Sequence, residues 1–354
     1  MQNSLDFLKD HDHEQLVYRY DRETGLQALI AVHSTTLGPG LGGTRLWRYA
    51  TIGDAANDVL RLSEGMTYKA AVAGLSLGGG KSVIMADGKE KDPVVRQRRF
   101  EAFGRMIESI GGDYIAAEDV GTKPMDMVYI KQHTDYVVGM PVNKGGSGDP
   151  SPMTALGVFH GIRALVEAVY HTDNMKDLRV AIQGLGKVGM ALAKHLMNAG
   201  AYVTGTDVSP ELTQYARELG MKTVPPEAIY DVPCDIFSPS ALGAVINDDT
   251  IKRLTCKIVA GPANNQLETE YHGQVLHDLG ITYGVDYVLN SGGLINVAAE
   301  LDGYDENLAH KRTLEIYDTI KHLLEISHIE NIPTTKAAAI MAKDALEQKK
   351  PITA

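Results

Sequence analysis

The 354 residues, 44% of them hydrophobic and 22% charged, exceed what one hydrophobic core usually supports, so two globular domains are expected. With 34 Lys and Arg against 45 Asp and Glu, the formal net charge is -11, which argues against nucleic acid or an anionic membrane as a partner. The two cysteines have no metal-binding spacing, no apolar run is long enough to span a membrane, and the N-terminal residues are polar. We therefore expect a reduced, cytoplasmic protein that has no metal site and acts on small molecules.

Strand-like runs alternate with helical patterns in the first part of the chain. Residues 26–33, 114–117 and 136–139 are typical of strands, whereas residues 52–66 and 93–110 have helical spacing. This alternation predicts an α/β domain.

Three glycines precede Lys81 and Ser82, which suggests a phosphate-binding P-loop at first sight. The P-loop pattern needs a glycine where this chain has Leu75. The residues after Lys81 are Ser-Val-Ile-Met, which favour a strand over the helix that a P-loop begins. We therefore expect a strand here and a role for Lys81 other than phosphate binding.

Residues 139–155 are dense in Gly, Pro, Ser and Asn, which is typical of a connection between domains. Within them, Thr154 is a candidate cap for the helix that follows. A second strand and helix series begins at Leu178, so we predict domains over residues 1–146 and 147–330. The tail from Thr313 to Gln348 is predicted to be mostly helical, and the domain against which it packs stays open, with a return of residues 331–354 to the first domain as one alternative.

A G-x-G-x-x-G turn follows the first strand of this second series and opens a helix, which is the context of a Rossmann-type dinucleotide site. In such a turn the first glycine permits the bend, the second admits the pyrophosphate, and the third lets helix and strand pack closely. The predicted cofactor-binding residues of the turn are Gly184, Leu185, Gly186, Lys187, Val188 and Gly189.

Asp207 stands at the end of the next predicted strand. A carboxylate there accepts hydrogen bonds from the ribose hydroxyls and repels a 2′-phosphate. The sequence therefore predicts NAD rather than NADP as the cofactor.

Eight stretches together resemble the family of amino-acid dehydrogenases that includes the glutamate, leucine, phenylalanine and valine enzymes. The resemblance covers nearly the whole chain, from about Glu14 to about Ile326, and is strongest to the leucine enzymes. The stretches, in family order, are LGPGLGGTR, GMTYKAA, LGGGKSVI, AAEDVGT, GDPSPMTALGV, QGLGKVG, AGPANNQL and NSGGLINVA.

The resemblance implies an N-terminal α/β substrate and catalytic domain that also oligomerises, and a Rossmann-type NAD-binding domain separated from it by a cleft. It implies that Lys81 is the catalytic acid/base and that Asp119 is its partner in proton transfer. Lys69, the backbone N–H groups of Gly42 and Gly43, and Asn265 are implied to bind the substrate α-carboxylate, and Asn264 to contact the cofactor.

The reaction implied by this resemblance is reversible oxidative deamination of an L-amino acid to a 2-oxo acid and ammonia. Leu41 stands where the glutamate enzymes have a lysine for the distal carboxylate, and Val297 stands where they have a serine. Because a γ-carboxylate would be desolvated there without a partner, we expect glutamate to be rejected.

The remaining pocket positions implied by the resemblance are Ala117 and Leu294. Ala117 matches the leucine enzymes, whereas Leu294 departs from their usual valine and occurs in phenylalanine-type members. We favour a branched-chain substrate, most of all leucine, and keep an aromatic amino acid as the alternative. We expect the departures Ser240 and Pro262 to change loop stiffness more than chemistry.

A different class of function is a sensor module that binds NAD without turnover. It accounts for the glycine turn and Asp207, but gives no reason for Lys69, Lys81 and Asp119 to occur together. We therefore favour an enzyme, acting on a small-molecule amino acid and expected to form a homo-oligomer.

Overall fold

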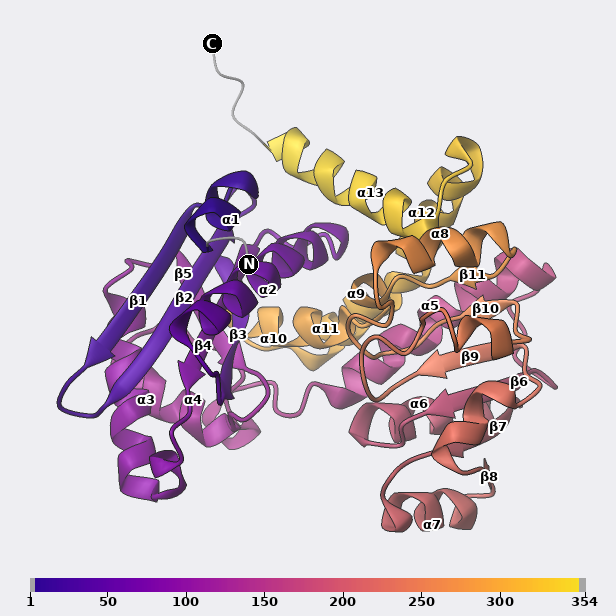
Figure 1. The fold of residues 1–354 in the computed structure, drawn as a ribbon, viewed down its shortest axis with the longest axis horizontal. Helices are drawn as coiled ribbons and strands as arrows, with labels where there is room; N and C mark the ends of the chain where they lie inside the picture. Colours follow the sequence, from indigo (N-terminus) through magenta and orange to yellow (C-terminus); the bar gives the residue numbers. More distant parts are fainter. Residues whose placement is uncertain (1–3, 350–354) are drawn as a thin grey trace. The chain divides into compact units, whose positions relative to one another are not determined.

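The computed structural model describes residues 4–349, and the chain divides into two compact units (Figure 1). The first unit runs through Asp149 and also takes in Val297–Glu306 and the chain from Ala342 onward. The second consists of Pro150–Asn296 and Asn307–Met341. The sequence predicted a boundary after residue 146 and a second crossing near residues 286–330, and the chain does pass between the units more than once. Residues 350–354 of the C-terminal segment lie outside the described part.

The first unit contains a mixed five-stranded sheet in the order β1-β2-β4-β3-β5. Strands β1 and β2 form an antiparallel pair, β2 is also antiparallel to β4, and β3 lies parallel to both β4 and β5. The strands are β1 (Gln15–Asp21), β2 (Leu26–Ser34), β3 (Gly40–Trp47), β4 (Gly78–Met85) and β5 (Tyr114–Glu118).

Both faces of this sheet are covered, and β2 shows why. Its side chains alternate, so that Ile30 joins a core with Phe103 of α3, whereas Leu29 joins a second core with Leu60 of α2. Helix α2 begins where the Thr51 side chain accepts the Asp54 amide in a capping box. The helices are α1 (Ser4–Asp10), α2 (Ile52–Val72), α3 (Pro93–Glu108) and α4 (Pro124–Lys131).

The predicted α/β class is confirmed, and so is the strand at Lys81, which is β4. The strand predicted over residues 136–139 is wrong, because only one isolated bridge, between Val137 and Ala116, forms there. The predicted cap Thr154 is also wrong. Helix α5 starts at Ser151, and the Thr154 hydroxyl donates back to the Pro150 carbonyl from inside the first turn.

The second unit contains a six-stranded parallel sheet in the order β11-β10-β9-β6-β7-β8. The strand order reverses between β6 and β9, and in doubly wound folds ligands bind outside the carboxyl ends of the strands at such a switch point. The strands are β6 (Arg179–Gln183), β7 (Tyr202–Thr206), β8 (Lys222–Thr223), β9 (Ile236–Pro239), β10 (Ile258–Val259) and β11 (Thr282–Tyr283).

Helices connect these strands and form the C-terminal part of the chain (Figure 1). The predicted helical character of the tail is confirmed by α12 and α13. The helices are α5 (Ser151–Tyr170), α6 (Lys187–Asn198), α7 (Pro210–Glu218), α8 (Glu270–Asp278), α9 (Asp286–Leu289), α10 (Gly292–Ala298), α11 (Glu306–Leu314), α12 (Ile316–Glu330) and α13 (Thr334–Lys349).

Within the first unit, the carboxylate of Glu300 ties together two segments that lead to the second unit. Glu300 follows α10, and its oxygens accept the amides of Gly139, at 3.0 Å, and Ser147, at 2.6 Å. The Ser147 hydroxyl also donates to it, at 2.5 Å. One side chain therefore fixes both the connection around residues 139–147 and the return segment.

Candidate active site

The glycines around Lys81 serve close packing of the backbone. A Cβ on Gly42 of β3 would lie 1.7 Å from the Gly80 carbonyl oxygen of β4, and one on Gly79 would lie 2.1 Å from the Thr67 hydroxyl of α2. A Cβ on Gly80 would meet the Tyr114 ring at 2.5 Å. The run Gly78–Gly80 is therefore required where β4 passes between its neighbours, and a phosphate loop is not needed to explain it.

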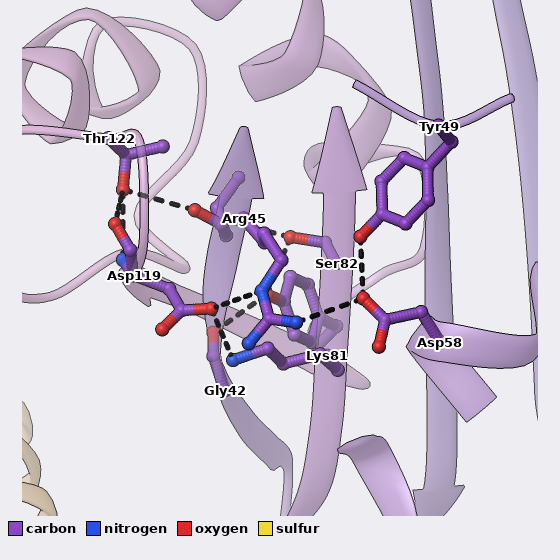
Figure 2. A network of polar contacts seen from close by, with 10 residues as sticks. Gly42, Arg45, Tyr49, Asp58, Lys81, Ser82, Asp119 and Thr122 are labelled. Atoms are coloured by element: carbon purple, nitrogen blue, oxygen red, sulfur yellow. Dashed lines mark hydrogen bonds and ion pairs between the residues drawn. The ribbon is translucent and has the colours of Figure 1, made fainter. Parts of the chain in front are cut away.

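Lys81 is buried, with 6% of its surface exposed, and its ammonium group meets a carboxylate. Lys81 Nζ and Asp119 Oδ2 are 2.8 Å apart (Figure 2). Asp119 follows β5, where the Thr122 hydroxyl accepts its amide at 2.8 Å and so fixes the start of the turn. A Cβ on Gly43 would lie 2.7 Å from the Asp119 Cβ and 3.3 Å from Lys81 Nζ, so only a glycine fits beside this pair.

Arg45 of β3 is the second cation at Asp119. Its Nε donates to Asp119 Oδ2 at 3.1 Å, and its Nη1 donates to Asp58 of α2 at 3.0 Å (Figure 2). The Tyr49 hydroxyl donates to the same Asp58 oxygen at 2.5 Å. The spacing of the chain did not indicate this network, although alternation along Gly43-Thr44-Arg45 does put Arg45 on the same side of β3 as Gly43.

These contacts decide the charge of Asp119. Burial by itself raises the pKa of this carboxyl, but the charges and hydrogen bonds of Lys81 and the charge of Arg45 outweigh it, so the pKa lies below its ordinary value. Asp119 is therefore held as a carboxylate.

The other side of the same strands is closed by hydroxyl groups. The Ser82 hydroxyl lies 2.9 Å from both the Thr44 hydroxyl and the Tyr114 hydroxyl, and Tyr114 donates to the Gly42 carbonyl at 2.7 Å. Complete burial raises the pKa of Tyr114 above its ordinary value, so it remains a neutral donor. The Gly42 carbonyl is thereby satisfied within the core.

Among the predicted substrate-binding residues, Lys69, Leu41 and Ala117 lie on elements that contact β4, the strand of Lys81. Lys69 is half-buried in the last turn of α2, the helix that packs on β4. Leu41 of β3 is buried, and Ala117 of β5 pairs in register with Gly43. Val297, at the end of α10, is also buried. Leu294, near the start of the same helix, is half-buried and belongs to the second unit.

The glycine turn of the second unit connects β6 to α6, as the sequence predicted. Gly184 has a φ of 103°, in the region that favours glycine. A Cβ on Gly189 would lie 2.1 Å from the Gly184 carbonyl oxygen, whereas a Cβ on Gly186 would meet nothing within 4 Å. The turn is thus tight behind Gly189 and open at Gly186, where a pyrophosphate needs room. Lys187 and Val188 form the first turn of α6, whose N–H groups favour an anion.

Asp207 directly follows β7 and also supports this turn. Its Oδ2 accepts the Leu185 amide and its Oδ1 accepts the Ser209 amide, each at 2.8 Å. Each carboxylate oxygen has a further lone pair, so the side chain can accept ribose hydroxyls while it holds the turn. These features fit a dinucleotide bound at the switch point between β6 and β9.

Asn264 and Asn265 lie in the loop after β10. Asn265 has a φ of 52°, and its carbonyl accepts the amide of Ala244 from the loop after β9, at 2.7 Å. Asn290 is a residue whose individual role the sequence did not indicate. Its side-chain amide donates to the Pro262 carbonyl at 3.0 Å and to Asn264 Oδ1 at 2.7 Å, and so shapes the loop.

Within residues 4–349, which the structure describes, no three or more His, Cys, Asp or Glu side chains are arranged to bind a metal ion. None of the described helices combines the length and the apolar character that a membrane span requires.

Comparison with known proteins assigns both parts of the chain. Residues 13–136 match the family model described as Glu/Leu/Phe/Val dehydrogenase, dimerisation domain, and residues 145–209 and 205–350 match that of Glutamate/Leucine/Phenylalanine/Valine dehydrogenase. A leucine dehydrogenase of Thermoactinomyces intermedius is 49% identical over 97% of this chain and 93% of its own length. A phenylalanine dehydrogenase of Bacillus thermotolerans is 42% identical over 97% of this chain and 91% of its own.

A solved structure shows the same fold over nearly all residues. The crystal structure of L-tryptophan dehydrogenase from Nostoc punctiforme matches with a TM-score of 0.86 and 41% identity, covering 98% of this chain and 99% of that one. Since sequence and fold agree over both units, the chain belongs to the glutamate/leucine/phenylalanine/valine dehydrogenase family and is an amino-acid dehydrogenase, an oxidoreductase of the CH–NH2 group in a family that uses NAD(P).

Proposed function

We propose that the protein catalyses the NAD-dependent, reversible oxidative deamination of an apolar L-amino acid, foremost leucine or another branched-chain amino acid, to its 2-oxo acid and ammonia. The observation that carries the proposal is the ion pair between the buried Lys81 and Asp119, two groups that can exchange a proton, held where the closely packed glycines of β3 and β4 meet. Identities of 47–49% to leucine dehydrogenases over most of the chain support leucine as the substrate.

In this proposal Lys81 and Asp119 move protons. Lys81 accepts a proton from the water that attacks the imine carbon of the oxidised substrate, and Asp119 passes a proton to the departing ammonia. Their atoms are 2.8 Å apart, which is a distance at which a proton is exchanged directly. Lys69, the amides of Gly42 and Gly43, and Asn265 are assigned to the α-carboxylate.

A bound nicotinamide would supply the acceptor for the hydride of the substrate Cα. In the proposal the turn from Gly184 to Gly189 and Asn264 hold this cofactor, and Asp207 selects NAD. The proposal for NAD rests on the charge of Asp207, because a 2′-phosphate beside a carboxylate that already supports the turn is repelled.

The proposed substrate pocket consists of Leu41, Ala117, Leu294 and Val297. Leu41 and Val297 are buried and apolar, so a γ-carboxylate placed against them would be desolvated without a partner, at a cost of about 2 kcal/mol or more. Leu294 supports an aromatic amino acid as the second candidate, because one methylene changes discrimination by only about 1–3 kcal/mol.

We further propose that the enzyme acts in the cytoplasm as a homo-oligomer. The acidic composition with few cysteines and the match of the first unit to a dimerisation domain support these two points.

Initial rates test the function. The panel consists of L-leucine, L-valine, L-isoleucine, L-phenylalanine, L-tryptophan and L-glutamate, each with NAD and with NADP at alkaline pH. We expect the highest kcat/KM for leucine or another branched-chain amino acid with NAD, and none for glutamate. A higher value for phenylalanine or tryptophan would establish the second candidate, and NADH binding without turnover of any amino acid would favour a sensor module.

A further inference from the structure

Asp119 receives two cations on one oxygen. Lys81 Nζ lies 2.8 Å and Arg45 Nε lies 3.1 Å from Asp119 Oδ2. Neither of these two cations contacts the other oxygen, Oδ1 (Figure 2). The backbone of Val120 also hydrogen-bonds the Asp119 carboxylate. The two oxygens are therefore unequal: both cations fix Oδ2, and each carboxylate oxygen has two lone pairs, so that Oδ1 can still accept a substrate proton.

Arg45 is itself held at both ends. Its Nε meets Asp119, its Nη1 meets Asp58, and the Tyr49 hydroxyl donates to that same Asp58 oxygen (Figure 2). A planar guanidinium group bound to two carboxylates has little freedom to turn. The orientation of Asp119 is thereby passed on from α2 through Arg45 to the carboxylate.

The two cations differ in one respect that matters for proton transfer. An arginine remains charged throughout the working pH range, whereas a lysine acting as acid/base loses its charge in every cycle. Without Arg45, a neutral Lys81 would leave Asp119 as a buried carboxylate without a counter-ion, and burial would then favour its protonation.

We propose that Arg45 is a positioning residue for the reaction: it keeps Asp119 ionised and oriented, with Oδ1 available to the substrate amino group, whether or not Lys81 carries its proton. This inference rests on the proton-transfer roles proposed above for Lys81 and Asp119. Asp58 and Tyr49 support it by holding the far end of the guanidinium group.

The charged and titratable groups that face Asp119 come from four elements. They are Lys81 of β4, Arg45 of β3, Tyr114 of β5 and, behind Arg45, Asp58 of α2. Burial raises the pKa of Asp119, and Lys81 and Arg45 together bring it below its ordinary value. Removing Arg45 should therefore move the titration of this one carboxyl upward.

Two variants and a matched control separate this role from a general loss of stability. Arg45→Met removes both the positive charge and the N–H donors of the guanidinium group. Arg45→Lys keeps the charge, but its single ammonium group cannot reach both carboxylates. Arg99→Met is the control, because it breaks another arginine–aspartate pair of the first unit, between Arg99 and Asp87, which touches neither Asp119 nor the turn that follows it.

The first measurement needs no turnover. The ¹³Cγ signals of labelled aspartate are followed through acid pH in the full-length protein, and the Asp119 signal is assigned by its loss in Asp119→Asn. We expect the midpoint to rise by about one pH unit in Arg45→Met and to stay near the parent value in Arg45→Lys and Arg99→Met. An unmoved midpoint in Arg45→Met would overturn the inference even if the parent turned over no amino acid, which alone would refute the proposed function.

The second measurement is turnover with the best substrate of the panel. We expect kcat to fall about 10²-fold in Arg45→Met with KM changed much less, about tenfold in Arg45→Lys, and less than twofold in Arg99→Met. If Arg45→Met does not fold, Arg45→Lys tests the positioning role. A kcat equal to that of the parent in Arg45→Lys would show that the guanidinium group does not position Asp119.

Discussion

Lys81 shows how a residue can be charged and buried without serving only stability. Its single described ionic partner is Asp119, and Gly43, on which a Cβ would lie 3.3 Å from Lys81 Nζ, lies directly beside the pair. A purely structural ion pair of this kind is often replaceable by apolar residues of similar volume. We therefore favour a role for this pair in the reaction over a role in stability alone.

We predict that Lys81→Ala reduces kcat by about 10³-fold or more, because the proposed acid/base is removed. The affinity for NADH should remain within about twofold, since the glycine turn and Asp207 belong to the other compact unit. Stopped-flow rates and a fluorescence titration with NADH measure the two quantities. If NADH affinity fell as much as the rate, Lys81 would contact the cofactor and a phosphate role would return.

At the scale of elements, two glycines of the turn between β6 and α6 differ in the space that a Cβ would have. A methyl group on Gly189 has no room, whereas a methyl group on Gly186 meets open space. We therefore predict that Gly189→Ala lowers the free energy of unfolding by about 1–3 kcal/mol, and that Gly186→Ala leaves it nearly unchanged but weakens NADH binding. Thermal unfolding and NADH titration check both variants. Equal stabilities for the two would contradict this account of the turn.

The elements themselves were largely predictable from sequence, for physical reasons that differ from place to place. The turn at Gly184 and the strand at Lys81 were predictable because their signals are local: glycine spacing in one case, a β-branched run in the other. The segment at Val137 looked like a strand, but whether such a run pairs with neighbours along its length depends on tertiary context.

The residues of the site also differ in how far the sequence indicates them. Lys81 and Asp119 were singled out through motifs. Nothing in the sequence links Arg45 to Asp58 or places Asn290 against Pro262. Those contacts arise only when distant segments meet in the fold. Roles assigned by resemblance, such as that of Lys69, stay predictions until variants are measured.

At the scale of the whole molecule, the chain leaves the first unit after Asp149 and re-enters it at Val297. Glu300 lies in the segment that re-enters the first unit, and it accepts hydrogen bonds from the amides of Gly139 and Ser147 in the segment that leaves it. A carboxylate can accept all of these hydrogen bonds, whereas an amide offers only one accepting oxygen.

We predict that Glu300→Gln lowers the free energy of unfolding by about 1–3 kcal/mol and speeds proteolysis within residues 139–148, because buried amides lose their acceptor. Limited proteolysis with mass spectrometry locates the cleavage. Asp302→Asn is the matched control, since Asp302 is an exposed acid of the same turn. Identical cleavage rates for Glu300→Gln, Asp302→Asn and the parent would show that the fastening is not needed.

The network around Arg45 has one more consequence, which concerns long-range attraction. Lys81, Arg45, Asp119 and Asp58 are two cations and two anions joined by short contacts, so as a group they are electrically neutral. Such a group presents almost no field beyond a few ångströms, and a zwitterionic amino acid offers no net charge for it to attract. The rate at which substrate arrives should then change little with salt concentration. Selection among amino acids would fall to the shape of the pocket instead of to electrostatic steering.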